Sequence, residues 1–289
     1  MKKILAISGG VDSMVMLDIF VKKFDKTELV VATFDHSARE SSKEDCDFVS
    51  EVCSALEIPV YRGKAEKLTK ISEEKARALR YDFLRKIAFK EKGEIFTAHH
   101  LDDLVETITI NLFRGTGFRG LACLSSPGIR RPFLDGLLDP EEFGFSAFDK
   151  SSILTYASKN DIHFRLDPTN ETSVYLRNRV REKTRSLPLE KKLTLFELWQ
   201  AQKSLVKEID SLTESILPEN LIFSRSIFSE LNDSTSLEIL RAALLRAGVS
   251  TTIPQRKEFL TAIRTYASEK MFNLPKDKMV KIHKQNFML

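Results

Sequence analysis

The chain of 289 residues is 42% hydrophobic and 30% charged, a globular composition with room for one large domain or two smaller ones. Its net charge of +4 is uneven, because residues 1–150 hold 23 Lys and Arg against 25 Asp and Glu, whereas residues 151–289 hold 22 against 16. No apolar run approaches the ~20 residues of a membrane-spanning helix, and the apolar start is too short for a signal peptide, so we expect a cytoplasmic protein with no membrane partner.

The first part of the chain alternates short apolar runs with helical patterns. Strands are expected at 4–7, 29–34, 59–61 and 94–99, and helices at 14–23, 43–56, 72–92 and 102–113. Apolar strands without alternation, separated by helices, indicate an α/β fold with a doubly wound parallel sheet. Ligands of such sheets bind beyond the carboxyl ends of the strands. Polar residues of this chain gather there, at Ser8–Ser13, at Asp35 and His36, and at His99–Asp103.

Near residue 190 the pattern changes to helical spacing alone. Helices are expected at 193–216, 237–247 and 256–267, with a short strand or two near the end. The sequence therefore predicts two domains, residues 1–190 and a smaller, mostly helical domain of residues 191–289. The basic excess of the second half suits an anionic partner such as RNA, although such an excess is often only a solvated surface.

The turn after the first strand reads Ser8-Gly9-Gly10-Val11-Asp12-Ser13. A glycine-rich turn between a strand and a helix directs backbone N–H groups at one point, where an anion is favoured. The turn lacks both GxxxxGK[ST] and GxGxxG, so transfer of a γ-phosphoryl group is not indicated. A tight turn with Asp12 stabilising the helix N-terminus is the alternative interpretation.

This S-G-G-x-D-S turn resembles the PP-loop of the N-type ATP pyrophosphatases, which cleave ATP between the α- and β-phosphates. Further motifs are "FDHSARESSKED", "EEKARALRYDFL", "TAHHLDDLVETITINLFRGTG", "IRRPFL" and "DPTNETSVYLRNRVR". Together and in this order they resemble the tRNA(Ile)-lysidine synthetase family over residues 1 to about 185. Ser37-Ala38 departs from the family, which usually has Gly-Leu there. The chain ends at Leu289, so we expect a compact form without the further domain of long members.

The resemblance implies a two-step ligation of lysine to tRNA. ATP adenylylates the C2 oxygen of the wobble cytidine in an isoleucine tRNA with a CAU anticodon, and pyrophosphate leaves. The amine of free L-lysine then displaces AMP, which gives lysidine. The expected substrates are thus ATP, with Mg²⁺, free L-lysine and this tRNA.

The same resemblance assigns roles to individual residues. Catalytic roles fall to Asp12, Asp35 and Arg114, and Mg²⁺ binding to Asp12 and Asp102. Arg114 and Arg131 are expected near the phosphates, since guanidinium groups bind phosphate bidentately, or else lie in solvated loops. ATP binding is assigned to Ser8, Gly9, Gly10, Val11, Asp12, Ser13, His36, His99 and Arg131.

Lysine binding is assigned to Asp103 and Glu106, which share one face of a helix at i and i+3. Helix capping is the alternative for Asp102 and Asp103. Contact with tRNA is assigned to Arg177, Asn178 and Arg181, for which a solvated helix face is the alternative. Phosphate contacts would make RNA binding strongly salt-dependent.

Three questions stay open at the level of the sequence. A tRNA thiolase, or a non-catalytic module that binds a nucleotide or RNA, would share the loop. A thiolase needs a reactive cysteine or a CxxC cluster, and Cys46, Cys53 and Cys123 form no such cluster. The stretch Asp135–Lys150 has no predicted chemical role and is expected to be a surface insertion or a lid. The oligomeric state is undetermined, with a homodimer among the options.

Overall fold

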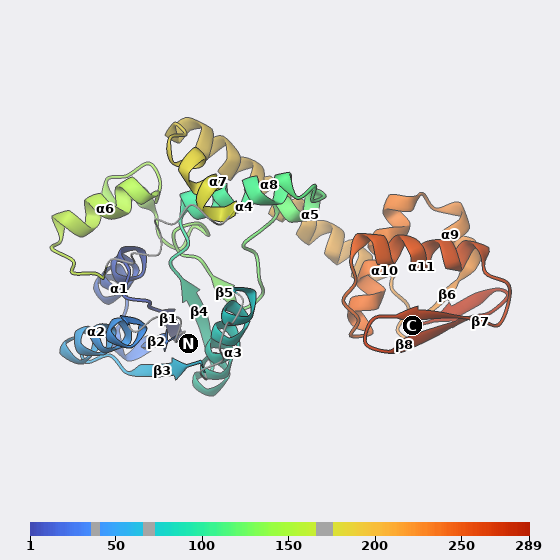
Figure 1. Ribbon diagram of the computed structural model, residues 1–289, viewed down its shortest axis with the longest axis horizontal. Coiled ribbons are helices and arrows are strands. Elements are labelled where there is room, and N and C mark those ends of the chain that lie inside the picture. The colour runs from blue at the N-terminus through green and yellow to red at the C-terminus, as the bar shows by residue number, and fades with distance from the viewer. Residues whose placement is uncertain (36–40, 66–72, 166–175) are drawn as a thin grey trace. The chain divides into compact units, whose positions relative to one another are not determined.

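The computed structural model describes residues 1–35, 41–65, 73–165 and 176–289. The chain divides into two compact units, Met1–Lys203 and Ser204–Leu289 (Figure 1). Each unit has its own hydrophobic core. Among the described residues no helix is both long enough and apolar enough to cross a membrane.

The first unit is built on a five-stranded sheet in which all pairings are parallel. The strand order is β3-β2-β1-β4-β5, so the chain winds outward from β1 in both directions, and the prediction of a doubly wound sheet is confirmed. The order reverses between β1 and β4, which is where ligands bind in such sheets. The strands are β1 (Lys2–Ala6), β2 (Leu29–Asp35), β3 (Val60–Lys64), β4 (Gly93–Thr97) and β5 (Ile129–Arg130).

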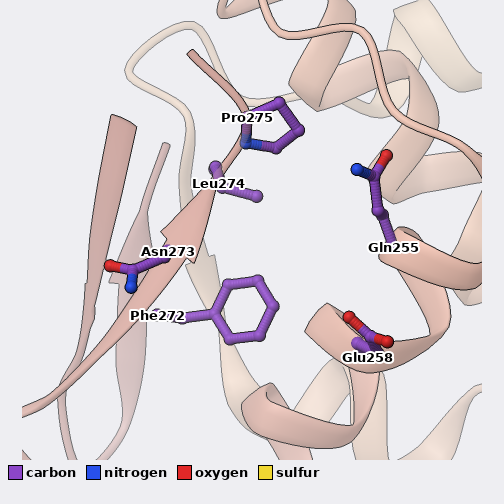
Figure 2. Close-up of a pocket in the computed structure, with 6 residues that line it drawn as sticks. All are labelled: Gln255, Glu258, Phe272, Asn273, Leu274 and Pro275. Atoms are coloured by element: carbon purple, nitrogen blue, oxygen red, sulfur yellow. The ribbon is translucent and has the colours of Figure 1, made fainter. Parts of the chain in front are cut away.

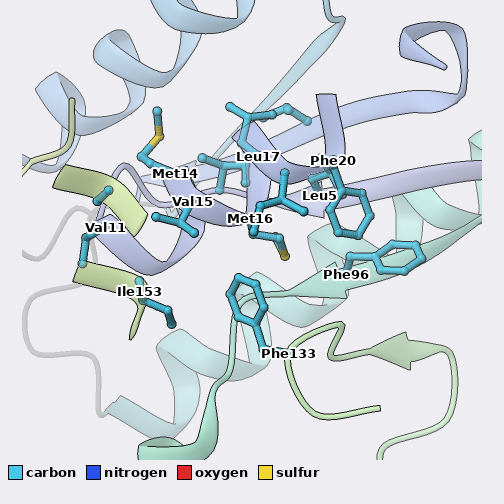
Figure 3. Close-up of a cluster of buried hydrophobic side chains, with 14 of the residues drawn as sticks. Leu5, Val11, Met14, Val15, Met16, Leu17, Phe20, Phe96, Phe133 and Ile153 are labelled. Atoms are coloured by element: carbon cyan, nitrogen blue, oxygen red, sulfur yellow. The ribbon is translucent and has the colours of Figure 1, made fainter. Parts of the chain in front are cut away.

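Helices cover both faces of this sheet because successive strand residues point to opposite sides. Leu5 and Phe96 pack on one face against Phe20 of α1 (Figure 3), whereas Ile4 packs on the other against Leu84 of α3. The helices and 3-10 turns of this unit are α1 (Val11–Lys23), η1 (Lys26–Glu28), α2 (Ser41–Ala55), α3 (Glu73–Glu91), α4 (Leu101–Phe113), α5 (Phe118–Leu121), η2 (Pro140–Phe143), α6 (Lys150–Lys159) and α7 (Leu176–Arg185).

The four strands and four helices predicted for residues 4–113 are confirmed, with bounds that differ by a few residues. Strand β5 was not predicted, since two residues carry no periodic signal. The expectation of a surface insertion or lid at Asp135–Lys150 is wrong. Leu138 and Phe148 are buried in the core beside α1, and the carbonyl of Phe148 accepts a hydrogen bond from the backbone of Leu101 at 2.9 Å.

Helix α8 (Leu189–Ile216) contributes its first part to the first unit. Trp199 is buried against Leu104 of α4, and its Nε1 donates to the carbonyl of Cys123 at 2.6 Å. The division between the units therefore falls inside α8, after Lys203, whereas the sequence pattern places a domain boundary at residue 190. The pattern marks where the helix starts, but the packing of Trp199 decides which unit that part joins.

The second unit combines helices with a small antiparallel sheet of order β6-β9-β8-β7. Its core holds Phe228, Phe259 and Phe287, all fully buried. The predicted helices are confirmed, but the sheet is larger than the short strand or two expected. The elements are β6 (Ile222–Ser224), α9 (Arg225–Glu230), α10 (Asp233–Arg246), α11 (Ile253–Thr265), β7 (Lys270–Leu274), β8 (Lys278–Ile282) and β9 (Asn286–Met288).

Candidate active site

The glycine-rich turn between β1 and α1 is held by its two serines. The backbone N–H of Ser8 donates to Oγ of Ser13 at 3.2 Å, and that hydroxyl donates to the carbonyl of Gly10 at 2.9 Å. Gly9 has a φ of +86°, in the region that side chains disfavour. No side chain of the described residues caps α1 at Gly10. The first-turn N–H groups of α1 are therefore available to an anion.

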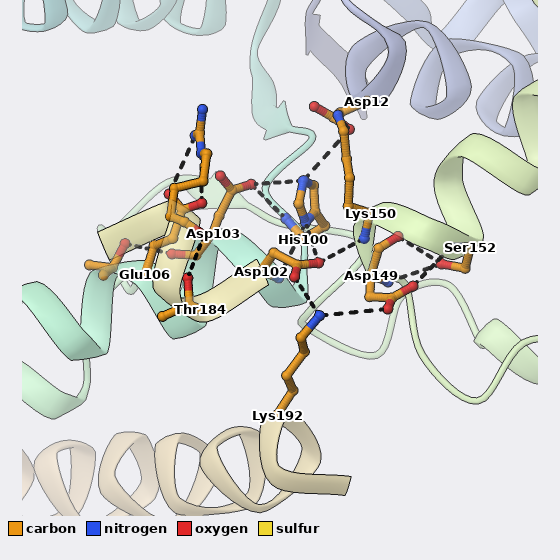
Figure 4. A network of polar contacts seen from close by, with 12 residues as sticks. Asp12, His100, Asp102, Asp103, Glu106, Asp149, Lys150, Ser152, Thr184 and Lys192 are labelled. Atoms are coloured by element: carbon orange, nitrogen blue, oxygen red, sulfur yellow. Dashed lines mark hydrogen bonds and ion pairs between the residues drawn. The ribbon is translucent and has the colours of Figure 1, made fainter. Parts of the chain in front are cut away.

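Asp12, in the first turn of α1, connects this loop to the rest of the site. Its Oδ1 lies 2.6 Å from Nζ of Lys150, the first residue of α6, and 3.6 Å from Nε2 of His100, the N-cap of α4 (Figure 4). The loop after β1 and the segment after β4 thus meet, as neighbouring strands of a doubly wound sheet require.

His100 is the centre of this polar network. It is buried, and its Nδ1 accepts a hydrogen bond from the backbone N–H of Asp102 at 3.3 Å. In the neutral ring the proton then sits on Nε2, which faces Oδ2 of Asp103 at 3.5 Å as well as Asp12. Burial alone would lower the pKa of His100, but the carboxylates of Asp103, Asp102 and Asp12 raise it above the ordinary value.

Asp103 also closes a capping box, because its Oδ2 accepts the backbone N–H of His100 at 3.1 Å. Asp103 therefore caps α4, and the same hydrogen bond holds its carboxylate beside the loop. Glu106, one turn further along α4, is buried and pairs with Arg181 of α7. The pair is bidentate, with 2.7 Å from Nε to Oε1 and 3.3 Å from Nη2 to Oε2.

Asp102 binds two other elements to the start of α4. Its Oδ1 lies 2.7 Å from Nζ of Lys192 in α8, and its Oδ2 accepts the backbone N–H of Lys150 at 2.7 Å. Burial would raise the pKa of Asp102, but the nearby His100 ring and hydrogen bonds from Lys192 and the backbone of Lys150 hold it well below the usual range. Asp102 therefore stays ionised and joins α4 to α6 and α8.

The predicted Mg²⁺ ligands differ in how well they fit a metal ion. Both oxygens of Asp102 are engaged with an ammonium group and an amide, which leaves a cation no carboxylate oxygen there. Asp12 fits better, since Mg²⁺ takes one or two carboxylates together with substrate phosphates. Within the described ranges no three His, Cys, Asp or Glu side chains group as a metal site.

His99, the residue before His100, contacts a residue of β4. Its Nδ1 is 2.9 Å from Oγ1 of Thr97. Removal from water lowers the pKa of His99 to about 3, with Arg131 acting in the same direction and Asp103 opposing it. Arg131, after β5, is 4% exposed, and burial lowers its pKa as well.

The remaining predicted residues divide into three groups. Val11 and Asp35 are buried, at the start of α1 and at the end of β2. Arg114 is exposed at the far end of α4, about 20 Å along the helix from His100, so the structure does not bring it to the loop. The described residues do not include His36, Ser37-Ala38 or the motif Asp167–Asn170. The side chains of Arg177 and Asn178 are not described either.

Two lysines of the network were missed by the sequence analysis. Lys150 ends a stretch to which no role was given, and Lys192 sits in an ordinary charged run, Glu190–Lys192. The signal for Lys150 was local, since Asp149 before it caps α6. Lys192 had no local signal, because its partner Asp102 lies far away in the sequence.

A pocket of about 290 Å³ lies in the second unit (Figure 2). Its walls come from α11 and from the end of β7. Glu258 is its only charged lining residue, and a single exposed carboxylate suggests no particular ligand. The lining residues are Gln255, Glu258, Phe272, Asn273, Leu274 and Pro275.

Replacement of Lys192 by methionine is expected to destabilise the first unit by about 3 kcal/mol. The reason is that the Asp102 carboxylate, held ionised in a mostly buried place, would lose its cation. Chemical denaturation measures the effect. Lys191→Met, at the exposed neighbouring position, is the matched control, and equal losses in both variants would contradict the role of the buried pair.

The two adjacent histidines are expected to titrate in opposite directions. The raised pKa of His100 means that its protonation stabilises the fold below the unfolded pKa of about 6.5, and that this contribution is lost as pH rises through the folded value. His99 stays neutral down to about pH 3, so it opposes folding once pH falls below about 6.5. Imidazole nitrogen shifts in NMR spectra would resolve the two; a common midpoint near 6.5 would refute the assignment.

The turn after β1 contains two glycines between two serines, and it leads into the uncapped N-terminus of α1 beside Asp12. This is the arrangement of a PP-loop nucleotide-binding domain. The family model described as a PP-loop domain matches residues 1–186. The chain is similar to the U34-tRNA thiolase NcsA from Methanococcus maripaludis, with a TM-score of 0.54, 18% identity and 72% of each chain covered. At that identity the likeness shows the fold alone.

Curated sequences give the finer assignment. The chain is 34% identical to a tRNA(Ile)-lysidine synthase from Thermotoga maritima over 80% of its own length and 57% of that protein. It is 32% identical to one from Petrotoga mobilis, over 86% of its own length and 80% of that protein. The chain belongs to the tRNA(Ile)-lysidine synthase family. It spans little more than half the length of the Thermotoga relative.

Proposed function

We propose that this chain ligates free L-lysine to C2 of the wobble cytidine in an isoleucine tRNA with a CAU anticodon, at the expense of ATP. One observation supports this proposal above the others. Asp12 of the loop and Asp103 of α4 both lie within 3.6 Å of the same atom, Nε2 of His100. An anion-binding loop and an acidic group that suits an ammonium ion therefore share one site.

The loop suits the pyrophosphate part of ATP. First-turn N–H groups of α1 and the hydroxyl of Ser8 offer donors, and Lys150 supplies a fixed positive charge beside them. Negative charge that develops when the C2 oxygen attacks the α-phosphorus needs such groups in place beforehand. Mg²⁺, held by Asp12, would add positive charge at the departing pyrophosphate.

Asp103 and Glu106 are our candidates for lysine recognition. Asp103 presents its carboxylate beside the loop, and Glu106 lies one turn along the same face of α4. Arg181 already pairs with Glu106, so this part of the site offers both a negative and a positive group. A free amino acid carries both charges, which an Asp–Glu–Arg set can satisfy.

The tRNA is assigned to α7 and to the second unit. Arg177 and Asn178 lie in a helix with a strongly basic sequence, whereas Arg181 of the same helix is engaged with Glu106, and the second half of the chain carries the positive charge. Contacts to phosphates would make the affinity fall steeply with salt. We place the reaction in the cytoplasm, with tRNA and free lysine as its partners.

The alternatives lack support from the residues of the site. Burial raises the pKa of Cys53 and of Cys123 to about 11, so neither thiol is the reactive thiolate that thiolation needs. A non-catalytic nucleotide- or RNA-binding module would leave the carboxylates of α4 beside the loop without a purpose.

The proposal is tested by incubating the chain with ATP, radiolabelled lysine and tRNA that contains the CAU isoleucine species. Label is expected in tRNA only when ATP is present, with one AMP and one pyrophosphate released for each lysine incorporated. Binding of ATP without release of AMP would favour a non-catalytic module. Incorporation of sulfur, with none of lysine, would favour a thiolase.

A further inference from the structure

Three arginines lie near enough to His99 for their charges to act on it. Arg131, Arg77 and Arg80 each lower the pKa of His99. Arg77 and Arg80 belong to the "EEKARALRYDFL" motif on α3, and both place their guanidinium groups over the ring of Tyr81, at 5.0 and 5.4 Å. The proposed ligation leaves this motif without a role.

Arg131 is a buried cation, and within the part of the chain that the structure describes its guanidinium group makes one weak hydrogen bond. Its Nε has no hydrogen-bond partner among the described residues, and its Nη1 reaches only the carbonyl of Ile129, at a weak 3.4 Å. The neighbouring carboxylate of Asp135 accepts from Nε of Arg130 and from the backbone of Arg131, not from the Arg131 side chain. Burial of a guanidinium group without a carboxylate costs free energy unless another anion pairs with the group.

Arg77 adds a second charge that the described residues do not neutralise. Among the described residues, it has one hydrogen bond, to the hydroxyl of Tyr81 at 3.5 Å, and no carboxylate pairs with it. Arg77 and Arg131 are close enough for the charge of Arg77 to lower the pKa of Arg131. Two guanidinium groups next to a neutral histidine make a place that a phosphate would fill, since planar forks bind phosphate oxygens bidentately.

We propose that Arg77 and Arg131 bind a backbone phosphate of the RNA substrate next to the reacting nucleotide, separately from the loop that takes ATP. The inference rests on the proposed function. It gives Arg131 an RNA contact in place of the ATP contact expected from the sequence.

The place of Arg77 on α3 is our reason for assigning the phosphate to RNA. Nε2 of His100 lies 3.6 Å from Asp12 of the loop, whereas Arg77 lies on α3 and Arg131 directly follows β5. Helices α1 and α3 pack on opposite faces of the sheet, and β4 lies between β1 and β5. A ligation needs both nucleotides at this edge, and the RNA nucleotide brings its own flanking phosphates.

The test compares Arg77→Gln with the unsubstituted full chain in binding a fluorescent RNA stem-loop that carries a CAU anticodon. The variant is expected to bind the RNA about tenfold more weakly, and the slope of log affinity against log salt to fall by about 0.7, the value for one single-strand phosphate contact. Its affinity for ATP without RNA is expected to stay within about twofold. Arg77→Lys keeps the charge, so it should retain the salt slope while losing part of the affinity.

Arg85→Gln is the matched control. Arg85 lies on the same helix, 6.0 Å from the ring of Tyr81, but it is exposed and pairs with Asp82, so RNA affinity is expected to be unchanged. If Arg77→Gln binds the RNA as tightly as the unsubstituted chain does, this inference is overturned and the proposed function is not affected. An equal loss of ATP affinity would assign the arginines to ATP and also overturn it. No RNA binding by the unsubstituted chain would overturn the proposed function as well.

Discussion

Replacement of Asp12 by asparagine is expected to lower ATP-dependent AMP release by about a thousandfold. The carboxylate lies in the first turn of α1, beside the N–H groups that we assign to pyrophosphate, and it is paired with Lys150 at 2.6 Å. Its loss removes the proposed metal ligand and frees the lysine from its position. Release of labelled AMP in the presence of tRNA and lysine measures the effect.

Asp18→Asn is the matched control for this prediction. Asp18 lies on the same helix and pairs with Lys22 at 2.7 Å, while it also accepts a hydrogen bond from the hydroxyl of Tyr156. It is remote from the loop in sequence and in its contacts, so AMP release is expected to stay near normal. Near-normal release by Asp12→Asn itself would show that the loop acts without this carboxylate.

Replacement of Asp103 by asparagine is expected to raise the KM for lysine roughly tenfold to a hundredfold, the range for loss of one charged hydrogen bond. Asparagine can still accept the backbone N–H of His100, so the start of α4 is preserved. The KM for ATP is expected to change by less than about threefold.

This internal comparison separates recognition of lysine from damage to the whole site. Steady-state kinetics with lysine and ATP varied in turn give both constants for one protein. Equal increases in the two would mean that Asp103 acts through His100 and the loop rather than on the amino acid. An unchanged KM for lysine would remove Asp103 from lysine recognition.

Much of the fold was predictable because its signals are local. Apolar runs such as Leu29–Phe34 are strands buried on both faces, and the turn Ser8–Ser13 carries its anion-binding geometry in its own residues. Asp102 and Asp103 were predicted to lie at the start of a helix and do so. These features depend on backbone preferences and hydrogen bonds within a few residues.

The rest depended on contacts between distant segments. The partners of Asp102, of Glu106 and of Asp12 come from α6, α7 and α8, and only tertiary packing brings them to the ends of β1 and β4. Arg114 follows the same helix as Asp103, yet a helix rises 1.5 Å per residue, and that rise carries it far from the loop. Arg114 was therefore predicted too close to the loop because it is near Asp103 in the sequence. Lys150 and Lys192 were missed because their partners Asp12 and Asp102 are distant in the sequence.

In the proposed reaction the C2 oxygen of the wobble cytidine attacks ATP, and this oxygen leaves with AMP when the amine of lysine takes its place. The most direct measurement uses tRNA labelled with ¹⁸O at that oxygen and mass spectrometry of the AMP released. The released AMP is expected to carry the label, in proportion to the lysine incorporated. Lysine incorporation with unlabelled AMP would contradict this reaction.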